Sequence, residues 1–154
     1  METKNMKILI FSLNGEHYAT DICDVERILG YVHATEMPDA PNFIDGVLNY
    51  ENNILPIINL EKKFNFPTDK GQAINEDETT KIIVIKKDEK KFGIIVDTVY
   101  EVSDVSSDLF EEAPPITTTV SRRYMKGLIK LDNRIVILLD MKEILSEDEE
   151  DLIF

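Results

Sequence analysis

The chain has 154 residues, of which 43% are hydrophobic and 31% charged, and this is enough for a globular protein with a real core. Its formal net charge of −13 comes from 30 acidic against 17 basic residues, which argues against binding to a nucleic-acid phosphate backbone, because such binding requires clustered lysines and arginines. No apolar run approaches the ~20 residues of a membrane span, and the N-terminus lacks the apolar core of a signal peptide. A single cysteine, Cys23, leaves no intramolecular disulfide. These features predict a cytoplasmic protein.

The first half of the chain reads as short strands. A strand over 7–13 ends at Asn14-Gly15, a strong hairpin signal, and returns over 16–20. A tight turn at 21–25 leads into an extended segment over 26–31. After a proline-containing loop comes the hairpin that organises the chain, with an apolar run on each side of a polar turn at Glu51–Asn53. A short amphipathic segment over 60–64 follows.

The hairpin is repeated later in the chain. Residues 43–60 superimpose on 124–141 at an offset of 81, which aligns Gly46 with Gly127 and Asn52 with Asn133. The upstream strand over 7–11 matches 81–85 at an offset of 74. Two matched blocks in the same order indicate an internal duplication. The second copy then has strands near 81–87, 91–97, 99–103, 127–131 and 134–140, with a last helix over 141–145.

Five short strands per copy, without a long helical period, predict an all-β fold of two small antiparallel barrels. The predicted boundaries are subdomain 1 over about 7–66, a polar linker over 67–80 and subdomain 2 over about 81–146, all within one domain that spans 1–154. An acidic tail over 147–154 completes the chain. We expect this tail to be poorly ordered, because five like charges at 147–151 repel one another and cannot be buried unpaired.

The sequence offers little for catalysis. His17 and His33 are not at metal-ligand spacing with each other or with Cys23. There is no glycine-rich phosphate loop. A duplicated β-unit suggests a carboxylate pair of the aspartic-protease kind, but Cys23 stands in the first copy where Asp97 stands in the second. The prediction is a protein that is not an enzyme and has no cofactor or metal.

The duplicated unit resembles the CheW proteins, the adaptor family of bacterial chemotaxis. The motif is Phe43-Ile44-x-Gly46-Val47-x-Asn49 followed by Ile54-Leu55-Pro56-Ile57-Ile58-x-Leu60, and it is supported by Tyr18-x-x-Asp21-Ile22-x-x-Val25 and Lys126-Gly127-Leu128. The match runs from about Ile8 to Leu145. The resemblance implies two SH3-like five-stranded barrels packed together and no catalytic activity.

The same resemblance implies partners. CheW-like proteins couple the cytoplasmic tips of methyl-accepting receptors to a histidine kinase, whose regulatory domain has the same fold, in arrays at the membrane. The alternative is an auxiliary or divergent scaffold that serves a non-flagellar sensory array. No nucleic-acid partner and no direct membrane insertion are expected.

Strand edges and the groove between two barrels are where such a fold binds partners. The apolar candidates to line this groove are Val25, Ile28, Val96 and Val99, and the alternative reading of each is ordinary core. Gly46 and Asn49 are further interface candidates within the shared motif.

Two positions depart from the family pattern. Glu51 stands where the family usually has arginine, and Arg27 stands where it usually has an acid. Because both signs are reversed, we predict that Arg27 and Glu51 lie within ion-pair reach and influence partner choice, although the neighbouring Glu26 could account for a local shuffle.

Overall fold

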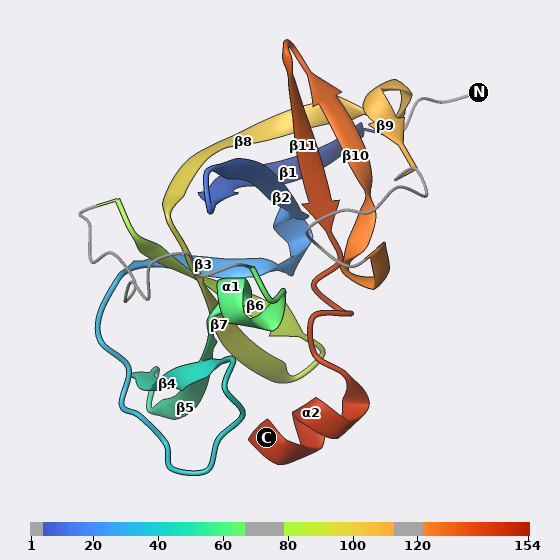
Figure 1. Cartoon of the computed structure of the whole chain (residues 1–154). Coiled ribbons are helices and arrows are strands. Elements are labelled where there is room, and N and C mark those ends of the chain that lie inside the picture. The colour runs from blue at the N-terminus through green and yellow to red at the C-terminus, as the bar shows by residue number, and fades with distance from the viewer. Residues whose placement is uncertain (1–4, 67–78, 113–121) are drawn as a thin grey trace.

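The structure is a computed structural model that describes residues 5–66, 79–112 and 122–154. Its strands form two sheets, one above the other in Figure 1. Sheet A has the order β8 (Thr98–Ser106), β1 (Asn5–Leu13), β2 (Glu16–Asp21), β11 (Arg134–Leu139), β10 (Met125–Leu131) and β9 (Phe110–Glu111). Sheet B has the order β3 (Val25–Gly30), β6 (Lys81–Lys87), β7 (Lys90–Val96), β5 (Asn53–Ile58) and β4 (Ile44–Tyr50). The helices are α1 (Leu60–Lys63), α2 (Glu147–Ile153) and three 3₁₀ turns at Ile22–Asp24, Ser107–Leu109 and Arg122–Tyr124.

The duplication is confirmed, but the predicted subdomain boundaries are wrong. In each sheet a hairpin from one copy (β1–β2 or β6–β7) is flanked by the later strands of the other copy, four of them (β8–β11) in sheet A and three (β3–β5) in sheet B. Strand β2 meets β11, and β7 meets β5, through equivalent short parallel pairings. Each subdomain is therefore built from both halves of the chain rather than from 7–66 or 81–146. Most of the predicted linker, 67–78, lies outside the described residues.

The exchange of strands explains the continuous apolar runs of β1 and β6. Neighbouring side chains of a strand point to opposite faces of the sheet, so a strand that is buried on both faces is apolar throughout. In β1, Ile8 and Ile10 face the core of sheet A, whereas Leu9 and Phe11 face a central core shared by both sheets. In β6, Ile83 and Ile85 likewise face the central core, whereas Ile82 and Val84 face the core of sheet B. The shared core joins the two subdomains.

Turns and bulges close the hairpins as their sequences predict. Asn14-Gly15 and Glu51-Asn52 both have positive φ at their two central residues, as tight hairpin turns with the twist of the strands require. Gly46 lies at a bulge in β4 with φ +155°, and a Cβ there would lie 2.4 Å from the carbonyl oxygen of Thr35. Only glycine allows this loop to lie against β4.

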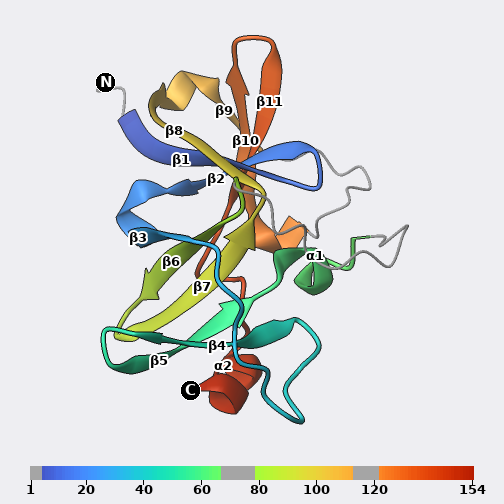
Figure 2. The same cartoon turned by 90° about the vertical axis from the view of Figure 1, so that its left-hand side faces the viewer.

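The C-terminal region differs from the predicted helix over 141–145 and from the predicted poorly ordered tail. Residues 141–145 form turns rather than a helix, and they bury Met141, Ile144 and Leu145 in the central core. The acidic segment forms α2, so the prediction of a poorly ordered tail is wrong. Its two less exposed carboxylates are paired, because lysines from elsewhere in the chain reach Glu149 and Glu150, while Glu147, Asp148 and Asp151 are exposed. Helix α2 follows β11 of sheet A yet lies beside sheet B (Figures 1 and 2).

Candidate functional site

The two edge strands β3 and β8 carry exposed apolar side chains at equivalent positions. Ile28 in β3 is 41% exposed and Val102 in β8 is 51% exposed. Within the described ranges each strand is the last of its sheet, with a partner on one side only. An unpaired strand edge beside exposed apolar side chains can bind a protein through backbone hydrogen bonds and side-chain contacts. These two edges are the candidate partner-binding surface, and Val102 was not among the predicted residues.

The predicted groove residues divide between surface and core. Val25 and Val99 are half-buried and pack against the central core at equivalent places in β3 and β8. Val96 is fully buried in that core, so it cannot contact a partner. It points inward because it lies in β7, a central strand of sheet B, which is covered on both faces.

The motif residues of β4 also have different environments. Gly46 is buried, and it has a backbone role in holding Thr35 rather than a surface role. Asn49 is exposed on β4, the strand at the opposite edge of sheet B from β3. The structure does not bring Asn49 together with Val25 and Ile28 on one strand edge.

The predicted ion pair between Arg27 and Glu51 is absent from the described part of the chain. Instead, Lys91 at the start of β7 lies 2.9 Å from the carboxylate of Glu26 and 3.8 Å from that of Glu51. The Tyr50 hydroxyl donates to Glu26 at 2.7 Å. Arg27 lies over the ring of Tyr50, at 5.6 Å from its centroid. Charges near Glu26 and Glu51 are therefore matched, but by a lysine from the other copy.

This charged cluster has a clear electrostatic consequence. The hydrogen bonds from Lys91 and then Tyr50 lower the pKa of Glu26 below its ordinary value of 4.5. The bond to Glu26 raises the pKa of Tyr50 from 10.0 to about 12. Glu26 thus stays ionised and Tyr50 protonated across the physiological range. The cluster fixes the conformation of one end of sheet B, beside the exposed edge β3.

Sequence reasoning missed Lys91 and Tyr50 for identifiable reasons. Lys91 is 65 positions from Glu26 in the chain, and the predicted boundaries placed the two residues in different subdomains. Tyr50 reads as one more apolar residue of a strand, although its hydroxyl needs a polar partner because the residue is only 6% exposed. In the alignment of the two copies, Lys91 is equivalent to His17 and Glu26 is equivalent to Tyr100. A lysine and a glutamate at these two equivalent positions are the signal that could have located the cluster.

Other features do not form a chemical site. Among the residues that the structure describes, no three histidine, cysteine, aspartate or glutamate side chains gather to hold a metal ion. An open, mainly apolar groove of about 380 Å³ lies at one end of sheet A, lined by Gly15, Glu16, His17, Leu128, Ile135 and Ile137. Within the described ranges no helix is long and apolar enough to cross a membrane.

Known proteins resemble the chain over almost its full length. The family model of the CheW-like domain matches residues 7–149. Chemotaxis protein CheW of Klebsiella aerogenes is 36% identical over 152 residues, which cover 99% of this chain and 89% of that protein. Chemotaxis protein CheW of Thermotoga maritima is 28% identical over 147 residues, with 94% and 90% covered.

A solved structure has the same fold. The crystal structure of the scaffolding protein TtCheW from Thermoanaerobacter tengcongensis matches with a TM-score of 0.82 and 30% identity, covering 96% of this chain and 92% of that one. The predicted architecture of two SH3-like subdomains is therefore confirmed. By its sequence, its fold and its duplicated strand order, the chain belongs to the CheW-like family of chemotaxis adaptors.

Proposed function

We propose that the chain is a non-catalytic adaptor that couples the cytoplasmic tips of methyl-accepting receptors to the regulatory domain of a chemotaxis histidine kinase. The observation that carries the proposal is the CheW-like family match over residues 7–149. An adaptor of this kind works in the cytoplasm, at receptor arrays on the membrane. The named relatives are chemotaxis proteins, which does not favour the alternative of a scaffold for a non-flagellar array.

The exposed strand edges support an adaptor. Ile28 and Val102 lie on two equivalent edges, one in each subdomain. An adaptor must hold two partners at once, and two separate edges on one molecule meet that need. Val25 and Val99 would continue the apolar surface from each edge towards the central core. In this proposal Arg27, Glu51 and Asn49 are surface residues that adjust the choice of partner by charge and hydrogen bonding.

Reconstitution tests the function. Purified kinase and receptor signalling fragments are mixed with and without the chain, and phosphorylation of the kinase is measured. We expect the chain to change kinase activity only when receptors are present, and to hydrolyse neither ATP nor peptides alone. If kinase activity is the same with and without the chain, the adaptor proposal is wrong.

Substitutions then test the surface. Ile28→Glu and Val102→Glu place a charge on each exposed edge, and each should weaken binding to one partner by about tenfold or more, since burying an unpaired charge is costly. Met37→Glu, at a 50% exposed loop position away from both edge strands, is the control for adding a charge in place of a surface apolar residue. Unchanged affinity in both edge variants would remove these edges from the interface while leaving the adaptor function open to the first test.

A further inference from the structure

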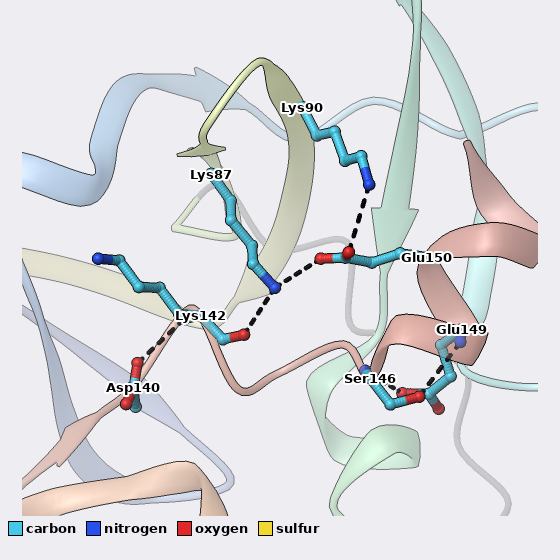
Figure 3. Close-up of polar contacts among 7 residues, drawn as sticks. All are labelled: Lys87, Lys90, Asp140, Lys142, Ser146, Glu149 and Glu150. Carbon is cyan, nitrogen blue, oxygen red and sulfur yellow. Dashed lines mark hydrogen bonds and ion pairs between the residues drawn. The ribbon is translucent and has the colours of Figure 1, made fainter.

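Helix α2 is held in place by ion pairs that cross from one subdomain to the other. Glu150 is paired with Lys87 at 2.5 Å and with Lys90 at 3.3 Å, as Figure 3 shows, and its side chain is 11% exposed. Lys87 also donates to the backbone carbonyl oxygen of Lys142 at 2.8 Å. Both lysines belong to the β6–β7 hairpin of sheet B, whereas the chain enters α2 from sheet A. The two pairs thus tie the C-terminus to the other subdomain.

Glu149 has two tasks at once. Its Oε1 accepts from the backbone N–H of Ser146 at 2.8 Å, while Ser146 Oγ accepts from the Glu149 N–H at 3.1 Å, which completes a capping box. Its Oε2 is paired with the ammonium group of Lys63. The start of the helix and its attachment therefore depend on the same carboxylate.

The helix has little stability of its own. It is seven residues long, well below the length at which isolated helices persist in water. Acidic residues favour its first turn through the helix dipole, but five like charges in succession repel one another. The additional stability of the helix comes from the packing of Ile153 against the central core and from the three lysine contacts. Helix formation and docking of α2 are thus one event.

Lys63 lies where the two copies meet. Its side chain is 6% exposed, and its ammonium nitrogen lies 4.4 Å from the ring centroid of Phe43 and 5.8 Å from that of Tyr124. These two aromatic residues occupy equivalent positions in the duplication, one before β4 of sheet B and one before β10 of sheet A. Among the described residues Glu149 is the only carboxylate paired with Lys63. Without α2, an ammonium group would remain buried between the subdomains without a counter-charge, which is strongly unfavourable.

We propose that α2 is a releasable latch whose attachment through Glu149 and Glu150 controls how tightly the two subdomains pack around Lys63. When α2 is attached, the charge of Lys63 is neutralised and the aromatic residues pack around it. When α2 leaves, Lys63 must reach water, and the packing of Phe43 and Tyr124 around its side chain has to loosen. A protein that binds the C-terminus and releases α2 can thereby loosen the packing between the subdomains without contacting the junction itself. The latch does not depend on which partners the chain binds.

Hydrogen exchange of backbone amides tests the latch in the full-length chain. The latch variant carries Glu149→Gln and Glu150→Gln; glutamine still completes a capping box, so only the ionic contacts are lost. The control variant carries Glu147→Gln and Asp148→Asn, which make the same change in net charge at two exposed positions of the same helix. The amides of Glu150 and Phe154 report on α2, since both donate within the helix. The amides of Asn59 and Asp140 report on the junction, because they donate to the carbonyl oxygens of Phe43 and Tyr124 at 2.8 Å each.

We expect exchange at all four reporter amides to be about tenfold or more faster in the latch variant, and to change much less in the control variant, which loses only a part of the favourable interaction with the helix dipole. Adding Lys63→Met to the latch variant should return Asn59 and Asp140 to the wild-type rate while α2 stays fast, because no buried charge remains and methionine fills the aromatic site. Equal rates in the latch and control variants would overturn the proposal. So would fast exchange in α2 with an unaffected junction, or a junction that Lys63→Met does not restore.

A second measurement needs no variant. Screening weakens ion pairs, so raising NaCl from about 0.05 M to about 1 M should speed exchange at Glu150 and Phe154 in the wild-type chain. The amide of Ile83, in the centre of sheet B, should not respond. If salt leaves the α2 amides unchanged as well, ionic contacts do not hold the helix and the latch is refuted.

Discussion

Glu26 and Tyr100 occupy the same place in the two copies, yet their side chains make different kinds of contact. Each is the extra residue of a bulge in an edge strand, β3 or β8. In sheet B, Glu26 forms an ion pair with Lys91 at 2.9 Å. In sheet A, Tyr100 lies against the ring of His17, with centroids 5.1 Å apart. The position of Lys91 in its copy is the position of His17 in the other.

The difference shows which features the duplicated fold constrains. The bulge is a property of the backbone, because it bends an edge strand around the hairpin beside it. The side chain of the bulged residue lies at the surface, where either an ionic or an aromatic contact can be accommodated. The bulged residue thus makes an ionic contact in sheet B and an aromatic one in sheet A, where the groove at Ile135 and Leu128 lies nearby. The two ends therefore share one backbone pattern and differ in their side-chain contacts.

The largest effects are expected at Gly46 and Gly127, and they test whether both copies require glycine at this equivalent position equally strictly. Gly46→Ala should reduce the free energy of unfolding by about 2–4 kcal/mol, because its Cβ would clash with Thr35 and its φ is unfavourable for alanine. Gly127→Ala, at the equivalent position, should cost about 1–3 kcal/mol, since the ring of Phe110 can move but the Glu111 carbonyl oxygen cannot easily do so. Urea unfolding measures both.

Gly30→Ala is the control for these two variants, since nothing lies within 4 Å of its Cβ position. We expect it to change stability by less than about 0.5 kcal/mol. If Gly46→Ala were as mild as Gly30→Ala, the close approach of the loop to β4 would not constrain the fold.

Tyr50→Phe tests the ionic end through its pH dependence. Loss of the hydroxyl bond to Glu26 should cost about 1 kcal/mol at neutral pH. The pKa of Tyr50 is raised from 10.0 to about 12, so its contribution is complete below pH 10 and is lost as pH rises towards 12. The wild-type chain should therefore lose its advantage over Tyr50→Phe across this interval.

Burial also raises the pKa of Tyr18, and this residue adds the same alkaline loss to both proteins. The comparison of wild type with Tyr50→Phe at each pH cancels it. A difference in stability that stayed constant from pH 8 to pH 12 would contradict the assigned bond.

Two double-mutant cycles sharpen the contrast between the ends. The Glu26–Lys91 cycle, with Glu26→Gln and Lys91→Met, should give a coupling of about 0.5–1 kcal/mol that falls as salt is added. The Tyr100–His17 cycle, with Tyr100→Leu and His17→Leu, should give a similar coupling from ring contact that salt does not change. Equal salt responses would mean that the two ends do not differ in the way their contacts suggest.

The smallest effect on stability is expected at Glu51. Its carboxylate is 3.8 Å from Lys91, and its side chain is 51% exposed, so Glu51→Arg should change the free energy of unfolding by less than about 0.5 kcal/mol. Partner binding should respond more, because the sign of a surface charge is reversed. Adding Arg27→Glu should not restore binding, since Arg27 and Glu51 are not paired. Recovery in that double variant would show that the two side chains do interact in the complex.

The amino-acid sequence by itself determined the strands, the hairpin turns and the duplication. These depend on local patterns, such as alternating apolar runs, Asn14-Gly15 and the shared position of Gly46 and Gly127, which are visible within a few residues. The family resemblance, and with it the all-β architecture, followed from the same local patterns. Ile28 was predicted as a groove candidate with ordinary core as the alternative, and the structure leaves it 41% exposed on the edge strand β3.

Only the tertiary structure decided which sheet each strand joins. The pattern of β3 is compatible with either hairpin, β1–β2 or β6–β7, because both are apolar on two faces; pairing with β6 was chosen by the packing of the shared core. The same packing buried Val96. Helix α2 is stabilised by Lys63 and Lys87, which folding brings to their acidic partners from 86 and 63 positions away in the chain. No local pattern in the tail could predict these counter-charges, because they come from distant parts of the sequence.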